Sequence, residues 1–128
     1  MKKELLCILK KYETHPDFLG DTIKDINQVG GMDDTVLHIV ARNNSLNDAL
    51  VFLKNGALID LKGDLGYTPL HYACMFGNIE MVKILLDYGS DKNIQNEFGE
   101  NAVRIAINSS SENKEKIVKL LNNYKKRK

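Results

Sequence analysis

The sequence predicts an all-α fold: a solenoid of about four helix-turn-helix units with short hairpin loops and degenerate capping units. The main observation is a hexapeptide, TPLHYA at residues 68–73, which is echoed as TVLHIV at residues 35–40 and as NAVRIA at residues 101–106. A fixed period of about 33 residues is typical of units that bury their apolar faces by stacking on one another. The composition agrees, because 128 residues with 43% hydrophobic and 27% charged residues suit one globular domain, residues 1–128.

Residues 1–30 are expected to form a degenerate N-terminal capping pair of helices. Apolar residues recur at helical spacing over residues 5–9. A second apolar stripe covers residues 18–26, after a break at His15-Pro16. The letters of this segment do not match the hexapeptide, so periodicity alone supports the unit.

The unit at residues 31–63 follows the same order of elements as its neighbour, with two departures. Val36 takes the place of the proline that follows threonine in the hexapeptide, and Asn44 stands where a helix-ending glycine is expected. Asparagine is the next best residue for a left-handed backbone. We therefore expect both helices of this unit to form.

The unit at residues 64–96 is the most regular. Thr68 can cap a helix, and Pro69 suits the first helical position, where a missing N–H group has no cost. Gly77 can end this helix in a left-handed conformation. A second helix is predicted over residues 79–88, because its apolar residues lie on one face.

The unit at residues 97–124 departs most from the pattern. Arg104 stands at the histidine position, and the loop between its two helices is about three residues longer than in the preceding unit. The last helix, predicted near residues 114–124, has lysines on its outer face, as a terminal capping unit requires. Residues 125–128 form a basic tail.

These motifs resemble the ankyrin repeat over residues 31–124. The unit at residues 64–96 matches the family pattern at Gly66, Thr68, Pro69, Leu70, His71, Ala73, Gly77, Leu85, Leu86, Gly89 and Asn93. The preceding unit matches it at Thr35, Leu37, His38, Ala41, Leu53, Gly56, Ala57 and Asp60. The resemblance implies a non-catalytic solenoid that binds other proteins.

His38 and His71 are the residues that most suggest catalysis or metal binding. In the ankyrin family this histidine braces the loop between neighbouring repeats through side-chain hydrogen bonds. Stacked helices lie about 8–10 Å apart, whereas a shared zinc ion needs both ring nitrogens within roughly 2 Å of it. The sequence also shows no phosphate-binding glycine loop and no calcium loop. We expect no catalytic residue, metal or cofactor.

Other features bear on location and on other classes of partner. No apolar run approaches the roughly 18 residues of a membrane span, and a four-residue basic tail is more typical of a solvated helix end than of a nucleic-acid site. The two cysteines, Cys7 and Cys74, both fall in apolar helical patterns. We expect both to be buried, reduced thiols, which favours a cytoplasmic location. We also expect the protein to be monomeric when free and to bind neither membrane nor nucleic acid.

Partners of ankyrin proteins usually contact the hairpin tips and the exposed side of the first helix of each unit. On this sequence the candidate partner-binding residues are Met32, Asp34, Arg42, Asp64, Leu65, Tyr67, Tyr72, Met75, Phe76, Glu97, Phe98 and Glu100. The wider concave face adds Ile39, Asn43, Ile105 and Asn108. Met32, Leu65 and Phe98 recur at one tip position of the repeat, where the family usually has a polar residue. The alternative is that some of these side chains pack between the hairpins.

The charge distribution suggests what the partner carries. From residue 13 to residue 100 there are 14 acidic and 6 basic residues, while the two ends hold the other 3 acidic and 12 basic residues. An acidic middle favours a basic partner.

Two hypotheses follow for the function. A small ankyrin protein of this kind resembles bacterial immunity proteins, so the first hypothesis is an inhibitor that occludes a cognate, basic toxin. The alternative is an adaptor or regulatory scaffold that bridges signalling partners. An adaptor needs a second adhesive surface, and the sequence does not reveal one.

Overall fold

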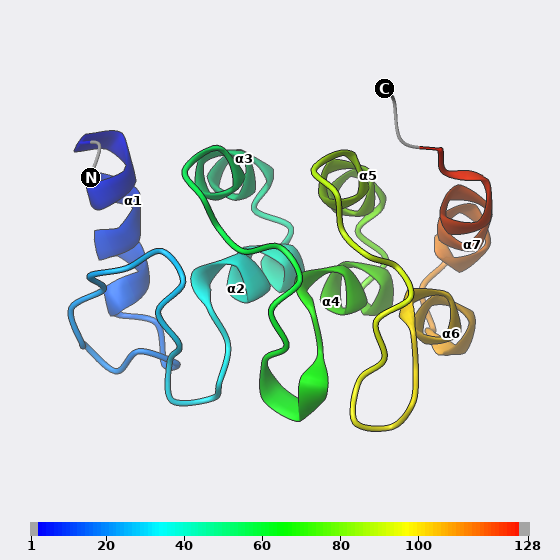
Figure 1. Cartoon of the computed structure of the whole chain (residues 1–128), viewed down its shortest axis with the longest axis horizontal. Coiled ribbons are helices and arrows are strands. Elements are labelled where there is room, and N and C mark those ends of the chain that lie inside the picture. The colour runs from blue at the N-terminus through cyan, green and yellow to red at the C-terminus, as the bar shows by residue number, and fades with distance from the viewer. Residues whose placement is uncertain (1–2, 126–128) are drawn as a thin grey trace.

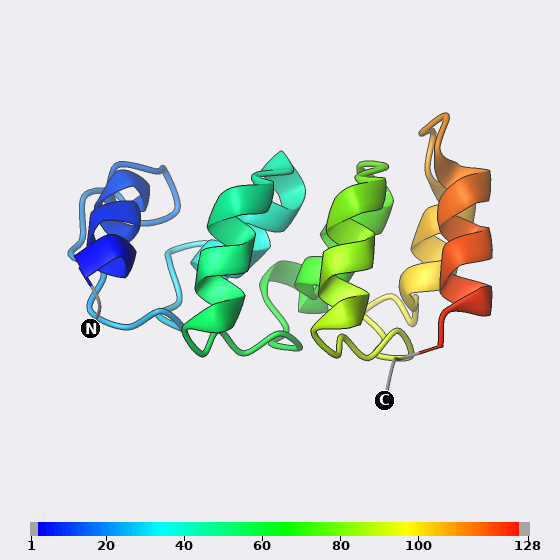
Figure 2. The same cartoon turned by 90° about the horizontal axis from the view of Figure 1, so that it is seen from above.

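The part of the chain that the computed structural model describes, residues 3–125, contains seven α-helices, one short 3₁₀ helix and no strand. The helices after residue 35 form two rows, and hairpin loops project from the inner row (Figure 1). The inner row comprises α2 (Val36–Asn43), α4 (Pro69–Met75) and α6 (Ala102–Asn108). The outer row comprises α3 (Leu46–Lys54), α5 (Ile79–Asp87) and α7 (Lys114–Asn123), which lie side by side in Figure 2. The predicted all-α solenoid is confirmed.

The N-terminal region differs from the prediction. Helix α1 (Lys3–Glu13) forms, and its axis crosses the axes of the outer helices (Figure 1). Residues 18–26, however, form turns and loop and not the predicted second capping helix. Leu19 and Gly20 adopt left-handed φ angles of 51° and 88°, which end any helical path at that point. Phe18 is nevertheless buried, so a loop places in the core an apolar side chain that we had assigned to a helix.

The helix ends follow the predicted capping chemistry. The N–H of His71 donates to Thr68 Oγ1 at 3.3 Å, and the N–H of Arg104 donates to Asn101 Oδ1 at 3.0 Å. Asn44 closes α2 with a left-handed φ of 59°, as its place in the pattern predicts. These caps fix where α4 and α6 begin, and so where the hairpins before them end.

Stacking of the helix pairs forms one continuous core. It runs from Leu5 and Phe18 at one end, through Phe52 and Leu85, to Ile117 at the other. Equivalent loop contacts join successive pairs, because Asn78 Nδ2 donates to the Ala41 carbonyl at 3.0 Å and Asn113 Nδ2 donates to the Gly77 carbonyl at 2.9 Å. The predicted unit limits 31–63, 64–96 and 97–124 each enclose one inner and one outer helix.

Candidate protein-binding surface

Three hairpins project side by side beyond the inner helices (Figure 1). Their tips carry Met32, Leu65 and Phe98, which are 55%, 46% and 62% exposed. Directly after each lies a residue with a left-handed φ: Asp33 at 65°, Gly66 at 79° and Gly99 at 75°. The repeat period therefore also governs the turn geometry. We call Met32, Leu65 and Phe98 the tip residues, and the row that they form the hairpin edge.

His38 braces the hairpin between α3 and α4. Its Nδ1 accepts the N–H of Thr35 at 3.1 Å, and its Nε2 donates to the carbonyls of Leu61 at 2.9 Å and Tyr67 at 3.0 Å. The ring must be neutral, because Nδ1 can accept only when it carries no proton. Burial lowers the pKa of His38 in keeping with this, although Asp34 opposes the shift.

His71 repeats the brace one unit later. Its Nδ1 accepts the N–H of Thr68 at 2.9 Å, and its Nε2 donates to the carbonyl of Glu100 at 2.8 Å. Burial again lowers the pKa of this histidine. The two rings thus hold the hairpins in place, as the resemblance implied. Arg104, at the equivalent position in the last unit, is exposed.

Neighbouring hairpins are also tied directly to each other. The N–H of Asp64 donates to Asp34 Oδ1 at 3.0 Å, and the N–H of Glu97 donates to the Leu65 carbonyl at 3.0 Å. The hairpins approach so closely that a Cβ atom on Gly66 would lie 2.9 Å from the Glu97 nitrogen. The tip residues are therefore displayed on an ordered edge, which limits the entropy that binding would lose.

Two of the predicted partner-binding residues are buried, and their assignment to the exposed surface is wrong. Tyr72 Oη donates to Asp34 Oδ2 at 3.1 Å, and both residues lie in the core between hairpin and inner helix. The Tyr72 ring stacks on Tyr67, with ring centroids 5.4 Å apart. Burial, followed by the negative charge of Asp34, raises the pKa of Tyr72, so the hydroxyl stays a donor. Ile39 and Ile105 on the predicted concave face are buried as well.

Arg42 lies at the margin of this buried cluster. Its guanidinium lies 5.3 Å from the centroid of the Tyr72 ring, and its nitrogens are 3.8 Å from Asp34 Oδ2 and 3.7 Å from Asp17 Oδ2. The side chain is 31% exposed, so only part of it can meet a partner. Arg42 therefore joins the N-terminal loop to the first repeat.

The remaining predicted residues keep at least part of their surface exposed. Exposed residues are Phe76 and Glu97, and half-buried ones are Asp64, Tyr67, Met75 and Glu100. Asn43 and Asn108 are exposed too. Asp33, Asp64, Glu97 and Glu100 place carboxylates on the hairpins that carry the tip residues. Such a surface can hold a basic, partly apolar segment.

Two residues that shape this surface did not enter the sequence prediction. Asn96 is buried, and its Oδ1 accepts the N–H groups of Phe98 and Glu100, both at 2.9 Å. An asparagine two residues before the tip is a readable sign of such a turn. Asp17 is buried beside Arg42, and no sequence pattern pointed to that contact.

Other chemistry is limited within residues 3–125. No group of three or more His, Cys, Asp and Glu side chains is arranged to hold a metal ion, and none of the helices there has the length and apolarity to cross a membrane. Cys74 is buried, which raises the pKa of its thiol to about 12. Cys7 is exposed on α1, so the expectation that both cysteines are buried is wrong for Cys7. Of the basic tail, residues 126–128 lie outside the described part of the chain.

The stacked helix pairs, their braced hairpins and the exposed tips define a class: repeat solenoids that present a binding surface to other proteins. The chain belongs to the ankyrin-repeat family, because a family model for three copies of the ankyrin repeat matches residues 5–96 and 37–128. Ankyrin repeats form a protein–protein interaction module, and the fold itself is non-catalytic. The family resemblance inferred from the sequence is confirmed.

Curated relatives share the repeats within much longer proteins. Palmitoyltransferase ZDHHC13 of Homo sapiens is 35% identical over 83 residues, which are 64% of this chain and 13% of the relative. Palmitoyltransferase ZDHHC17 of Rattus norvegicus is 38% identical over 71 residues, 55% of this chain and 11% of the relative. Palmitoyltransferase ZDHHC13 of Mus musculus is 41% identical over 68 residues, which are 52% of this chain and 11% of the relative. The match thus spans about an eighth of these relatives.

Proposed function

We propose that this chain binds a partner protein along the hairpin edge, with Met32, Leu65 and Phe98 as apolar anchors. The observation that carries the proposal is the repeated exposure of a large apolar side chain at one structural position in three successive hairpins. Exposed apolar side chains grouped in this way and rimmed by charge are typical of protein interfaces. The histidine braces and the links between hairpins support the same interpretation, because they order the edge before a partner arrives.

The partner segment that fits this edge is basic as well as apolar. Asp33 and Glu97 are exposed beside the tips, and Asp64 and Glu100 are half-buried next to them. Carboxylates at the rim of an interface steer an oppositely charged partner and reject an acidic one. Binding should therefore weaken as salt is added.

Of the two functional hypotheses, we favour the adaptor or regulatory scaffold over the toxin inhibitor. The relatives named above are palmitoyltransferases in which the matched repeats are a small part, which supports a recognition role inside a larger system. The acidic edge would also suit a basic toxin, but the matched relatives give that hypothesis no support. A cytoplasmic location remains a proposal, and the two free cysteines support it.

The test replaces two anchors with charge and leaves the fold intact. The double variant Leu65→Asp with Phe98→Asp is compared with Leu58→Asp with Tyr88→Asp, which alters exposed apolar residues away from the tips. Each purified protein is used for affinity enrichment with quantitative mass spectrometry, and candidates are then titrated against it by calorimetry. Leu65 has a left-handed φ of 54°, a conformation that aspartate tolerates better than leucine.

We expect the tip variant to lose a partner that the wild type and the control variant both retain. The loss of each anchor should raise the dissociation constant by about tenfold or more. Thermal unfolding midpoints of all three proteins should agree closely, because none of the four side chains belongs to the core. A partner bound equally by wild type and tip variant would refute the assignment of the hairpin edge.

A further inference from the structure

We propose that the outer surface of the last helix pair is a second binding surface, which takes an acidic amphipathic helix of a partner protein. This surface, here called the end face, lies between α6 and α7 and is lined by Ile107, Lys114, Glu115, Val118 and Lys119. It is separate from the hairpin edge, and its test does not depend on that edge.

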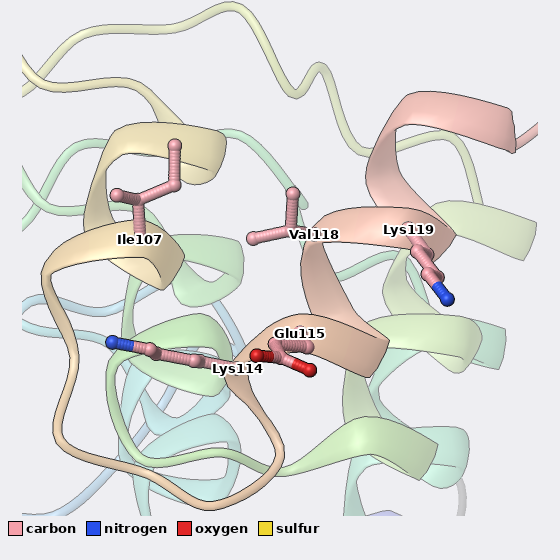
Figure 3. A pocket seen from close by; sticks show the side chains of 5 residues that line it. All are labelled: Ile107, Lys114, Glu115, Val118 and Lys119. Carbon is pink, nitrogen blue, oxygen red and sulfur yellow. The ribbon is translucent and has the colours of Figure 1, made fainter.

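The end face contains a hollow with an apolar floor. The hollow measures about 360 Å³, and Ile107 on α6 and Val118 on α7 flank it (Figure 3). Lys114 and Glu115 line it at the start of α7, and Lys119 lies one turn further along. A shallow groove between two helices, apolar at its base and charged at its margins, matches the way an amphipathic helix is bound by its apolar stripe.

Comparison with the inner repeats shows what makes this surface different. Ile107 occupies the position that Ala41 and Cys74 hold in the two preceding repeats. Ala41 and Cys74 are 0% exposed, and the next helix pair packs on the inner helix that carries each of them. Ile107, by contrast, is 45% exposed. The residue at this position is therefore small and buried in the two preceding repeats, but bulky and exposed in the last repeat.

The size of Ile107 indicates what kind of occupant fits. The distance between packed helices depends on the side chains at their contact. Alanine and cysteine allow α4 and α6 to pack closely on the preceding pair, but isoleucine would hold a further inner helix away. A single helix lying in the hollow between α6 and α7 meets no such obstacle and would cover both Ile107 and Val118.

The charges around the hollow set the sign of the partner. Exposed Lys114 and Lys119 line it, exposed Arg104 lies on the same helix as Ile107, and Glu115 is the acidic residue among the lining residues. The excess of positive charge favours a helix whose polar residues are acidic. The hairpin edge has the opposite sign, so one and the same partner segment would not suit both surfaces.

Two synthetic helices test the proposal with the whole 128-residue chain. Both peptides have leucine at positions i, i+3, i+4 and i+7, and one has glutamate and the other lysine at the flanking positions. Binding is measured by fluorescence anisotropy at low and high salt. The protein variants are Ile107→Glu, the charge swap Lys114→Glu with Lys119→Glu, and the matched control Leu58→Glu, which alters a similarly exposed apolar residue elsewhere.

We expect the wild type and Leu58→Glu to bind the glutamate peptide at least about tenfold more tightly than the lysine peptide, with binding weakened by salt. Ile107→Glu should lose this binding, and the charge swap should reverse the preference for the two peptides. The proposal is overturned if the glutamate peptide does not bind at about 1 mM, if both peptides bind alike, or if Ile107→Glu binds as the wild type does. Self-association of the wild type in sedimentation experiments that Ile107→Glu abolishes would overturn it too, because a second copy of the chain would then occupy the end face.

Discussion

The hydrogen bond between Tyr72 and Asp34 offers a direct test of how the hairpins are held to the inner helices. Tyr72→Phe removes only the hydroxyl group that donates to Asp34 Oδ2 at 3.1 Å. The ring remains, so its stacking on Tyr67 and its contact with the Arg42 guanidinium are retained. The change therefore isolates one buried polar interaction.

The expected loss of stability follows from the surroundings of the carboxylate. Asp34 is 1% exposed, so no solvent can replace the lost donor. Its Oδ1 keeps the N–H of Asp64 at 3.0 Å, and Oδ2 keeps only the guanidinium of Arg42 at 3.8 Å. Removing a hydrogen bond to a charged, buried acceptor costs about 1.5–3 kcal/mol, so we expect a decrease of that size in the free energy of unfolding.

Urea unfolding followed by circular dichroism measures this decrease. The control is Tyr88→Phe, because Tyr88 is an exposed residue at the end of α5 and its change should alter the free energy of unfolding by less than about 0.5 kcal/mol. An unchanged dependence on urea concentration would show that the variants unfold as the wild type does. If Tyr72→Phe costs no more than Tyr88→Phe, the buried carboxylate does not hold the hairpin, and the account of this cluster is wrong.

Two further changes test other parts of the fold. Leu70→Ala should lower the free energy of unfolding by about 2–5 kcal/mol in the same urea experiment, because Leu70 is almost fully buried and its loss leaves a cavity; a smaller loss would show that this inner helix is loosely packed. Burial lowers the pKa of His38 and His71 in the folded chain, so the unfolded chain takes up protons first as the pH falls. Stability should therefore decrease as the pH drops below about 6.5. A free energy of unfolding that stays constant between about pH 7.5 and pH 5.5 would show that the neutral rings are not required.

The repeat period explains why most of the fold could be predicted from the sequence. A residue at one position of a unit finds the same neighbours as its equivalent in the next unit, so one clear unit defines the others. His71 and His38 show this well, since each accepts one backbone N–H and donates to the hairpin that follows. The tip residues could be placed for the same reason, because Met32, Leu65 and Phe98 recur at one position of the period and all three are exposed.

The errors arose where the period gives no information about contacts across the stack. Residues 18–26 have helical periodicity, but the left-handed backbone at Leu19 cannot be read from apolar spacing. The family resemblance placed Asp34 and Tyr72 on the exposed surface, and here they are buried and hydrogen-bonded to each other across two repeats. A buried pair of this kind depends on two side chains at once, which a pattern of single positions does not reveal.

The two proposed surfaces together bear on the choice between adaptor and inhibitor. An inhibitor needs one surface, and the hairpin edge would suffice for it. An adaptor needs two that can be occupied together, and the sequence alone suggested only one. The end face supplies a second that differs in position and in sign of charge, since Lys114 and Lys119 line it while Asp33 and Glu97 border the tips. A partner with a basic segment and another with an acidic helix would then contact different residues of the chain. The charge reversal along the chain, which cancels in its net charge of +1, would make the proposed bridging chemically selective.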